Sequence, residues 1–212
     1  MLLDIAAFEL RYILRSPLSW FISLAFFAGG TLAFGFMAGE GASDIFALGR
    51  NVSFNAAFYI AVELLVISLA AFFVAPAFVG EPIIKDREYE FDCIVFSTPV
   101  SKFSYLYGKF LGGFGALLVT FLCAPLGMML SPLWAFPVPE GSLGPFNILH
   151  YLIAVLVYAL PSLLLYSSMV FVVAVIARKI IYTYLLNLAM FIFLFVGTAT
   201  IARLRLLTPD TL

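Results

Sequence analysis

The 212-residue chain is 64% hydrophobic and only 11% charged, whereas ordinary soluble domains are about 45–50% apolar and about 25% charged. Its net charge is −1, so a bulk electrostatic attraction to nucleic acid is not indicated. The apolar residues form long runs rather than the alternating pattern of a membrane β-barrel. The sequence therefore predicts an all-α fold, a polytopic bundle of transmembrane helices.

The chain opens with a segment, residues 3–15, that predicts an amphipathic helix lying at the membrane surface. Ile5, Phe8 and Tyr12 recur on one side at helical spacing, with charged residues elsewhere. Apolar runs follow, each long enough for the roughly 20 residues that a bilayer core requires. The five predicted spans are residues 18–38, 54–79, 105–130, 148–177 and 181–202.

The positions of the basic residues predict the orientation. With a cytoplasmic N-terminus, 8 of the 11 Lys and Arg residues lie on the cytoplasmic side, and the reverse orientation would place 3 there. The eight are Arg11, Arg15, Lys85, Arg87, Lys102, Lys109, Arg178 and Lys179. Five spans then place the C-terminus outside, and we expect the sequence to be a fragment that lacks a sixth span.

The connection between the second and third spans, residues 81–104, is rich in charge. Seven of the 23 charged residues of the chain lie within 81–92. Ile84, Glu88, Phe91 and Val95 share one helical face that is mostly apolar. This pattern favours a helix along the inner membrane surface, and an ordinary solvated loop is the alternative. Ser101 is well placed to cap the next helix.

Two features of the spans suggest specific roles. Glu63 lies well inside the second span, where a carboxylate costs about 2.5–3.5 kcal/mol on insertion scales. It is interpreted either as part of a substrate path or proton relay, or as a structural hydrogen bond to a neighbouring helix. Gly108 and Gly112 form a GxxxG motif in the third span. Such a motif is typical of close helix packing in lipid, or of local packing only.

No pattern in the sequence supports catalysis. Glu88 and Glu90 have no positioned partner for acid–base work. The only histidine is His150, so no HExxH zinc motif exists, and no GxxxxGK[ST] nucleotide-binding loop is present. The sequence therefore predicts a protein that is not an enzyme and holds no cofactor. His150, Trp134 and Tyr151 are expected to anchor helices at the outer interface.

Four segments carry a resemblance to a known family. They are Asn55-Ala-Ala-Phe-Tyr, Ala77-Phe-Val-Gly-Glu-Pro-Ile-Ile-Lys-Asp-Arg-Glu, Phe96-Ser-Thr-Pro-Val-Ser-Lys and Tyr105-Leu-Tyr-Gly-Lys-Phe-Leu-Gly. In order and spacing these resemble the ABC-2 type transporter permeases, most closely large bacterial permeases that carry a zinc aminopeptidase domain further along the chain. The resemblance covers most of residues 1–212, is specific in the middle and weakens after about Pro139.

The resemblance implies one six-helix membrane domain in the inner membrane, with an elbow helix before it. Such a domain pairs with a second permease domain and with ATP-binding subunits, which bind the ATP, and most members are exporters. In this family the loop between spans two and three docks into the ATPase. Here that loop is residues 81–97, with Lys85, Asp86, Arg87 and Glu88 at its centre. The sixth span and the peptidase of the family are absent from this sequence.

Two alternatives remain open at the level of sequence. One is a secondary transporter or channel that uses Glu63 and a membrane gradient. The other is a membrane anchor for a soluble domain that this sequence lacks. The mostly apolar helices would fit lipids, peptides or hydrophobic drugs equally well, so the sequence does not identify a substrate.

Overall fold

The computed structural model describes residues 1–38, 55–90, 100–134, 144–177 and 179–207. Every regular element in these ranges is a helix and none is a strand, which confirms the all-α prediction. Four helical stretches are long and apolar enough to cross a membrane, and they match the first four predicted spans. They are Pro17–Gly35, Ala57–Glu88, Lys102–Leu133 and Ile148–Ile176.

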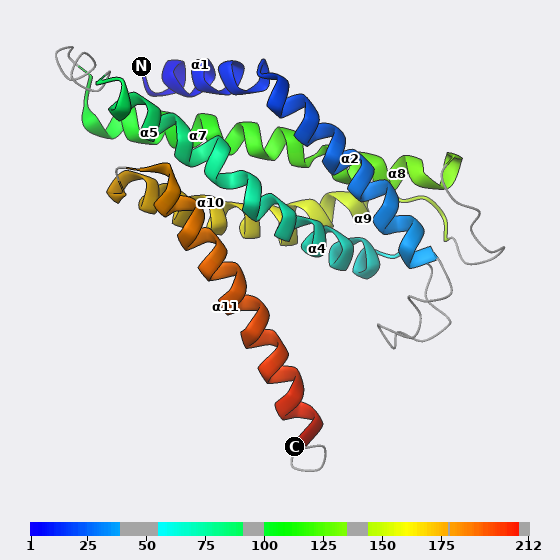
Figure 1. Ribbon diagram of the computed structural model, residues 1–212. Coiled ribbons are helices and arrows are strands. Elements are labelled where there is room, and N and C mark those ends of the chain that lie inside the picture. Colours follow the sequence, from blue (N-terminus) through cyan, green and yellow to red (C-terminus); the bar gives the residue numbers. More distant parts are fainter. Residues whose placement is uncertain (39–54, 91–99, 135–143, 178, 208–212) are drawn as a thin grey trace.

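The elements follow one another along the chain with short helical interruptions (Figure 1). They are α1 (Leu2–Leu14), α2 (Pro17–Ala38), α4 (Ala57–Ala75), the π-helical turn η1 (Pro76–Gly80), α5 (Glu81–Glu88), α7 (Lys102–Phe121), α8 (Cys123–Trp134), α9 (Ile148–Ile153), the π-helical turn η2 (Ala154–Ala159), α10 (Leu160–Ile176) and α11 (Ile180–Leu207). Ser101 caps α7 as predicted, because its Oγ accepts a hydrogen bond from the Ser104 N–H at 3.2 Å.

Two prolines are accommodated by the two π-helical turns. One residue separates each turn from a proline, and the backbone N–H of that residue reaches five residues back. Glu81 donates to the Pro76 oxygen and Leu160 to the Val155 oxygen. A proline ring clashes with the carbonyl four residues earlier in a regular α-helix. The wider turn relieves that clash, so each helix continues past its proline, Pro82 or Pro161.

Helix α11 leaves the bundle, and Figure 1 shows its C-terminal half diverging from the other helices. Near its start, Thr183 and Asn187 are buried, whereas Ile181 before them and Leu185 between them are exposed. The apolar stretch described in α11, Ile180–Phe193, is shorter than the four candidate spans. The fifth span therefore stays a prediction.

Helix α11 is attached to α4 through a proline. Pro76 has no N–H and so leaves the carbonyl of Phe72, four residues earlier, without its helical partner. The amide Nδ2 of Asn187 donates to that oxygen at 2.6 Å. The side chain thus satisfies a buried backbone group that the proline would otherwise leave unpaired.

The predicted GxxxG motif of α7 is the surface on which α1 packs. A Cβ on Gly108 would lie 2.9 Å from Ile5 Cβ, and a Cβ on Gly112 would lie 2.6 Å from Glu9 Cβ and 2.8 Å from the Ala6 oxygen. The absence of side chains therefore lets the two backbones approach closely. Helix α1 runs alongside α7 (Figure 1). This differs from the predicted surface-lying helix, which would cross a spanning helix steeply.

The two faces of α1 also differ from the predicted pattern. Ile5 is packed on Gly108, and Glu9 and Ile13 are buried. Phe8 and Tyr12 are instead exposed, with their rings stacked at 6.3 Å.

A second close contact joins α2 to α8. Gly30 meets the backbone of Ala124, and Gly127 meets the backbone of Phe27. Two hydroxyls bond across this contact: Thr31 Oγ1 donates to the Gly127 oxygen at 3.4 Å, and Ser131 Oγ donates to the Thr31 oxygen at 3.2 Å. Small residues and hydroxyls are the usual means of joining helices in lipid, where hydrophobic burial between helices is weak.

We predict that Gly112→Ala destabilises the protein by about 1–3 kcal/mol, because the new methyl group overlaps α1 and the backbones must separate. The matched control is Gly115→Ala on the same helix. A Cβ at Gly115 would meet only the flexible tip of Leu10, at 3.4 Å, so the control should be neutral or slightly stabilising. Unfolding midpoints in detergent measure both, and equal midpoints for the two variants would contradict the packing role.

Candidate functional site

The charged connection, for which a helix was favoured over a solvated loop, begins as a helix. Helix α5 continues the helix of α4 and η1, so that Ala57–Glu88 is one helical stretch of 32 residues, about 48 Å long at 1.5 Å per residue. A bilayer core is about 30 Å thick. The eight residues of α5, about 12 Å of helix, therefore extend an apolar helix that is already long enough to cross.

The apolar face of α5 is packed inward. Ile83 and Ile84 are each only 2% exposed, whereas Glu88 on the predicted apolar face is exposed. The other two residues of that face, Phe91 and Val95, lie outside the described residues.

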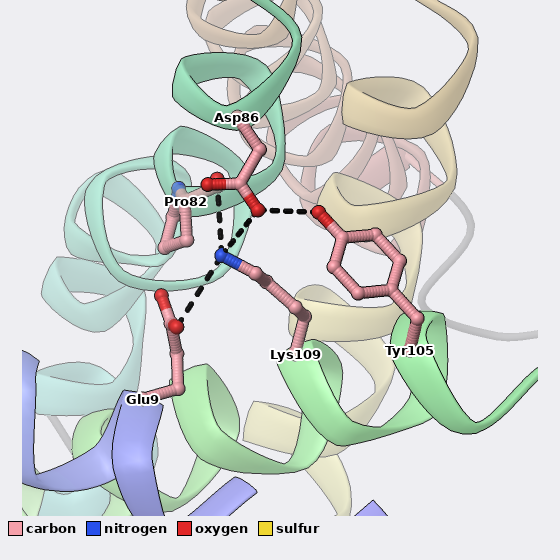
Figure 2. A network of polar contacts seen from close by, with 5 residues as sticks. All are labelled: Glu9, Pro82, Asp86, Tyr105 and Lys109. Carbon is pink, nitrogen blue, oxygen red and sulfur yellow. Dashed lines mark hydrogen bonds and ion pairs between the residues drawn. The ribbon is translucent and has the colours of Figure 1, made fainter. Parts of the chain in front are cut away.

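A buried ionic network ties α5 to α1 and α7 (Figure 2). The Lys109 ammonium of α7 lies 2.6 Å from Asp86 Oδ2 of α5 and 3.3 Å from Glu9 Oε2 of α1. It also donates to the Pro82 oxygen at 3.5 Å. The Tyr105 hydroxyl donates to the same Asp86 oxygen, and its ring centroid lies 5.8 Å from the Lys109 nitrogen.

The network holds two carboxylates against one ammonium in a largely buried site, in which the Asp86 side chain is 17% exposed. Glu9 and Tyr105 are 3% and 6% exposed, and the Lys109 side chain is 10% exposed. Burial raises the pKa of the Glu9 carboxyl above its ordinary value of 4.5; Lys109 acts in the opposite direction, and the nearby Asp86 raises the pKa further. Lys109 therefore neutralises the carboxylates of Glu9 on α1 and Asp86 on α5, which would be costly to bury without a cation.

Arg87 ties α5 to a further helix. Its guanidinium donates to the Val175 oxygen at 2.5 Å. That carbonyl belongs to the last turn of α10, which ends at Ile176, where carbonyl groups have no helical partner and the helix dipole favours a cation. Arg87 thus holds the end of α10 against α5.

The remaining two residues of the predicted coupling set face outward. The Lys85 side chain is 52% exposed and pairs with Glu81 at 2.6 Å on the helix surface. Glu88 is exposed at the end of α5. Exposed pairs of this kind contribute little to stability. The set therefore divides into two residues committed to the fold, Asp86 and Arg87, and two available at the surface, Lys85 and Glu88.

Glu63 is separate from this end of the molecule and is buried in α4, with 3% of its surface exposed. Its Oε2 makes no hydrogen bond to any described residue. None of the ion pairs between described residues includes it. This oxygen therefore lacks the structural hydrogen bond that was one of the two interpretations of Glu63.

Asn55 organises a polar cluster at the opposite end of the bundle from α5. Its Nδ2 donates to the Pro145 oxygen at 3.4 Å, its backbone oxygen lies 3.0 Å from His150 Nδ1, and its Oδ1 accepts the Tyr151 hydroxyl at 3.0 Å. Tyr151 is only 4% exposed. The expectation that Tyr151 anchors the chain at an interface is therefore wrong, because its hydroxyl is used inside the bundle.

The pairing of Glu9 with Lys109 was not predicted from the sequence. Lys109 was counted only as a basic residue on the cytoplasmic side, and Glu9 was given no role. One signal could have found them: Lys109 lies between Gly108 and Gly112, so the helix that packs on the motif must also meet the lysine. Within the described ranges, no three His, Cys, Asp or Glu side chains come together as metal ligands.

Neither comparison with known proteins identifies a relative. A scan against models of known families found no match, and a search of curated proteins found no significant similarity.

We predict that Lys109→Met destabilises the protein by about 3–5 kcal/mol, because it leaves Glu9 and Asp86 buried together without a cation. Adding Glu9→Gln to Lys109→Met should recover part of the loss by removing one of the two unpaired charges. The matched control is Lys85→Met, which breaks an exposed pair and should cost about 1 kcal/mol or less. Chemical unfolding in detergent measures all three variants, and equal losses for the two lysines would refute the network.

We predict that stability depends on pH through Glu9. Its pKa is higher in the folded protein than in the unfolded chain, so its contribution is fully present below pH 4.5 and is lost as the pH rises through the raised folded value. The unfolding free energy of the wild type should therefore fall relative to that of Glu9→Gln as the pH rises above this point. Unfolding at a series of pH values tests this; a difference that does not change with pH would contradict it.

Proposed function

We propose that the chain is the membrane-spanning permease component of an ABC-2 type transporter, an exporter driven by a separate ATP-binding subunit. The resemblance of residues 55–112 supplies the family, and no pattern for nucleotide binding or catalysis occurs in the sequence. ATP hydrolysis would then belong to the partner. A second permease domain, identical or different, would complete the transport path.

The observation that carries the proposal is the arrangement around α5. Its tip presents Lys85 and Glu88 to the surface, while Asp86 and Arg87 connect the same two turns of helix to three others. A push on the exposed charges would be passed to α7 and α1 through Lys109, and to α10 through the Val175 carbonyl. A coupling element needs this combination of an accessible surface and a rigid connection inward.

The proposed orientation places α5 and the N-terminus in the cytoplasm, with the bundle in the inner (plasma) membrane. The distribution of Lys and Arg supports this, with 8 of 11 on that side. Exposed charges at the α5 tip suit a docking surface because charge pairs at a rim set partner choice and register. Five spans, from α2 to α11, belong to the same proposal.

A gradient-driven transporter is a second candidate, and one observation favours it. Glu63 is a buried acid without an ion pair among the described residues, and such residues often mark ion pathways in membranes. This candidate needs no ATP-binding partner, so the two differ in what the purified chain does alone.

We predict that Lys85→Glu combined with Glu88→Lys abolishes co-purification of an ATP-binding-cassette subunit from native membranes, with the unfolding midpoint unchanged. Lys179→Ala, which removes an exposed charge outside α5, should leave co-purification intact. Asp86→Asn is expected to lower the midpoint as well, because Asp86 is part of the buried network, and so cannot test docking alone.

Two outcomes would contradict the permease proposal. One is recovery of the ATP-binding subunit with the double variant at wild-type levels. The other is substrate transport by the purified chain in vesicles that contain no ATPase, which would favour the gradient-driven candidate.

A further inference from the structure

Among the described residues, no ion pair includes the carboxyl of Glu63. The helices around α4 include α2, α8, η2 and α10, and none of these four contains an Asp, Glu, Lys or Arg residue. Its neighbours along α4, Ile60, Leu64 and Ile67, are buried in the hydrophobic core. An ionised carboxylate in such a place would lack both water and a cation.

The titratable groups that face this site are phenols. Tyr151 of α9 packs in the same buried core as Ile60 and Leu64, the neighbours of Glu63 on α4. Tyr59 precedes Glu63 by one turn on the same helix. Tyr166 of α10 packs on Phe72, more than two turns away, with ring centroids 4.7 Å apart. Lys109 of α7 is engaged with Asp86 and Glu9 at the other end of the bundle.

We infer that Glu63 is an intramembrane proton-binding site, protonated at neutral pH and reached through Tyr151 from the end of the bundle that holds Asn55 and His150. The uncompensated cost of a buried carboxylate favours the acid form. The Tyr151 hydroxyl donates to Asn55 Oδ1, and the tyrosine packs in the core beside the neighbours of Glu63. The half-exposed His150 meets the backbone of the same asparagine, so polar groups lead from the surface to the acid.

The inference does not depend on an ATP-binding partner. A permease could use the proton to keep Glu63 neutral in the bundle, and a gradient-driven transporter could use it as the coupling ion. The test therefore uses the purified full chain in lipid vesicles.

Dicyclohexylcarbodiimide, an apolar reagent that adds to carboxylic acids in their protonated form, is the first probe. The acid adds across the carbodiimide and the product rearranges to a stable N-acylurea, with no atom lost. At pH about 7, where an ordinary Glu is ionised, we expect a mass-mapped adduct on Glu63 at about tenfold or more the level on the partly exposed Glu81 and the exposed Glu88. Glu63→Gln should lose it.

Infrared spectroscopy of the same vesicles is the second probe and does not need reagent access. The wild type minus Glu63→Gln difference spectrum should contain a protonated carboxyl band at pH about 7. Its deuterium shift after transfer to heavy water should be slowed about tenfold or more by Tyr151→Phe. A carboxylate band in place of the acid band would overturn the proton site, whatever the labelling shows. An unchanged exchange rate in Tyr151→Phe would overturn the route.

Discussion

The ammonium of Lys109 is the point at which the charged end of the bundle is held together. It lies between carboxylates from two other helices, and the close approach of α1 to α7 at Gly108 and Gly112 brings one of these, Glu9, within reach. Close packing and charge neutralisation therefore depend on each other: without the glycines Glu9 would stay in water, and without the lysine the packed helix would bury an unpaired acid. Asp86 contacts the same nitrogen, so Lys109 connects α5 to both α1 and α7.

Prolines determine where the other polar contacts occur. Pro76 frees the Phe72 carbonyl, which Asn187 of α11 satisfies, and Pro82 frees the Phe78 carbonyl, which lies against Gly113 of α7. In lipid an unpaired carbonyl is costly and apolar side chains gain little by leaving the lipid tails for each other. The carbonyl freed by Pro76 is thus satisfied by α11, and the one freed by Pro82 lies at the close contact with α7, so helix positions depend on the backbone as well as on side-chain shape.

The sequence was sufficient for the helical class, the first four long apolar helices and the Ser101 cap, because each depends on local composition or on a single side chain. It was insufficient for the division within Lys85, Asp86, Arg87 and Glu88. Four consecutive residues of a helix point in four directions about 100° apart, and only the position of α7 and α10 decides which of them are buried. The predicted end of the second span near Val79 also differs, because the π-helical turn lets the helix pass Pro82 and continue to Glu88. The hydrogen bond from Tyr151 to Asn55 was also missed, because the two residues are distant in sequence and only the packing of the helices brings them together.

Helix α11 has a defined position against the bundle although few contacts hold it there. Its buried polar positions, Thr183 and Asn187, are one turn apart and face Gly80 and Phe72, whereas the residues around them are apolar and exposed. The Oγ1 of Thr183 and the Oδ1 of Asn187 are buried without a described partner. The apolar surface of α11 can pack in lipid or against another helix. Its present position is distinguished by the hydrogen bond from Asn187 to Phe72, the packing of Thr183 near Gly80 and the contact of the Phe73 and Phe191 rings, whose centroids are 4.9 Å apart. Helix α11 is therefore the element of the described bundle whose position a bound partner or substrate could change at the least cost, while α5 is the one that three helices hold in place.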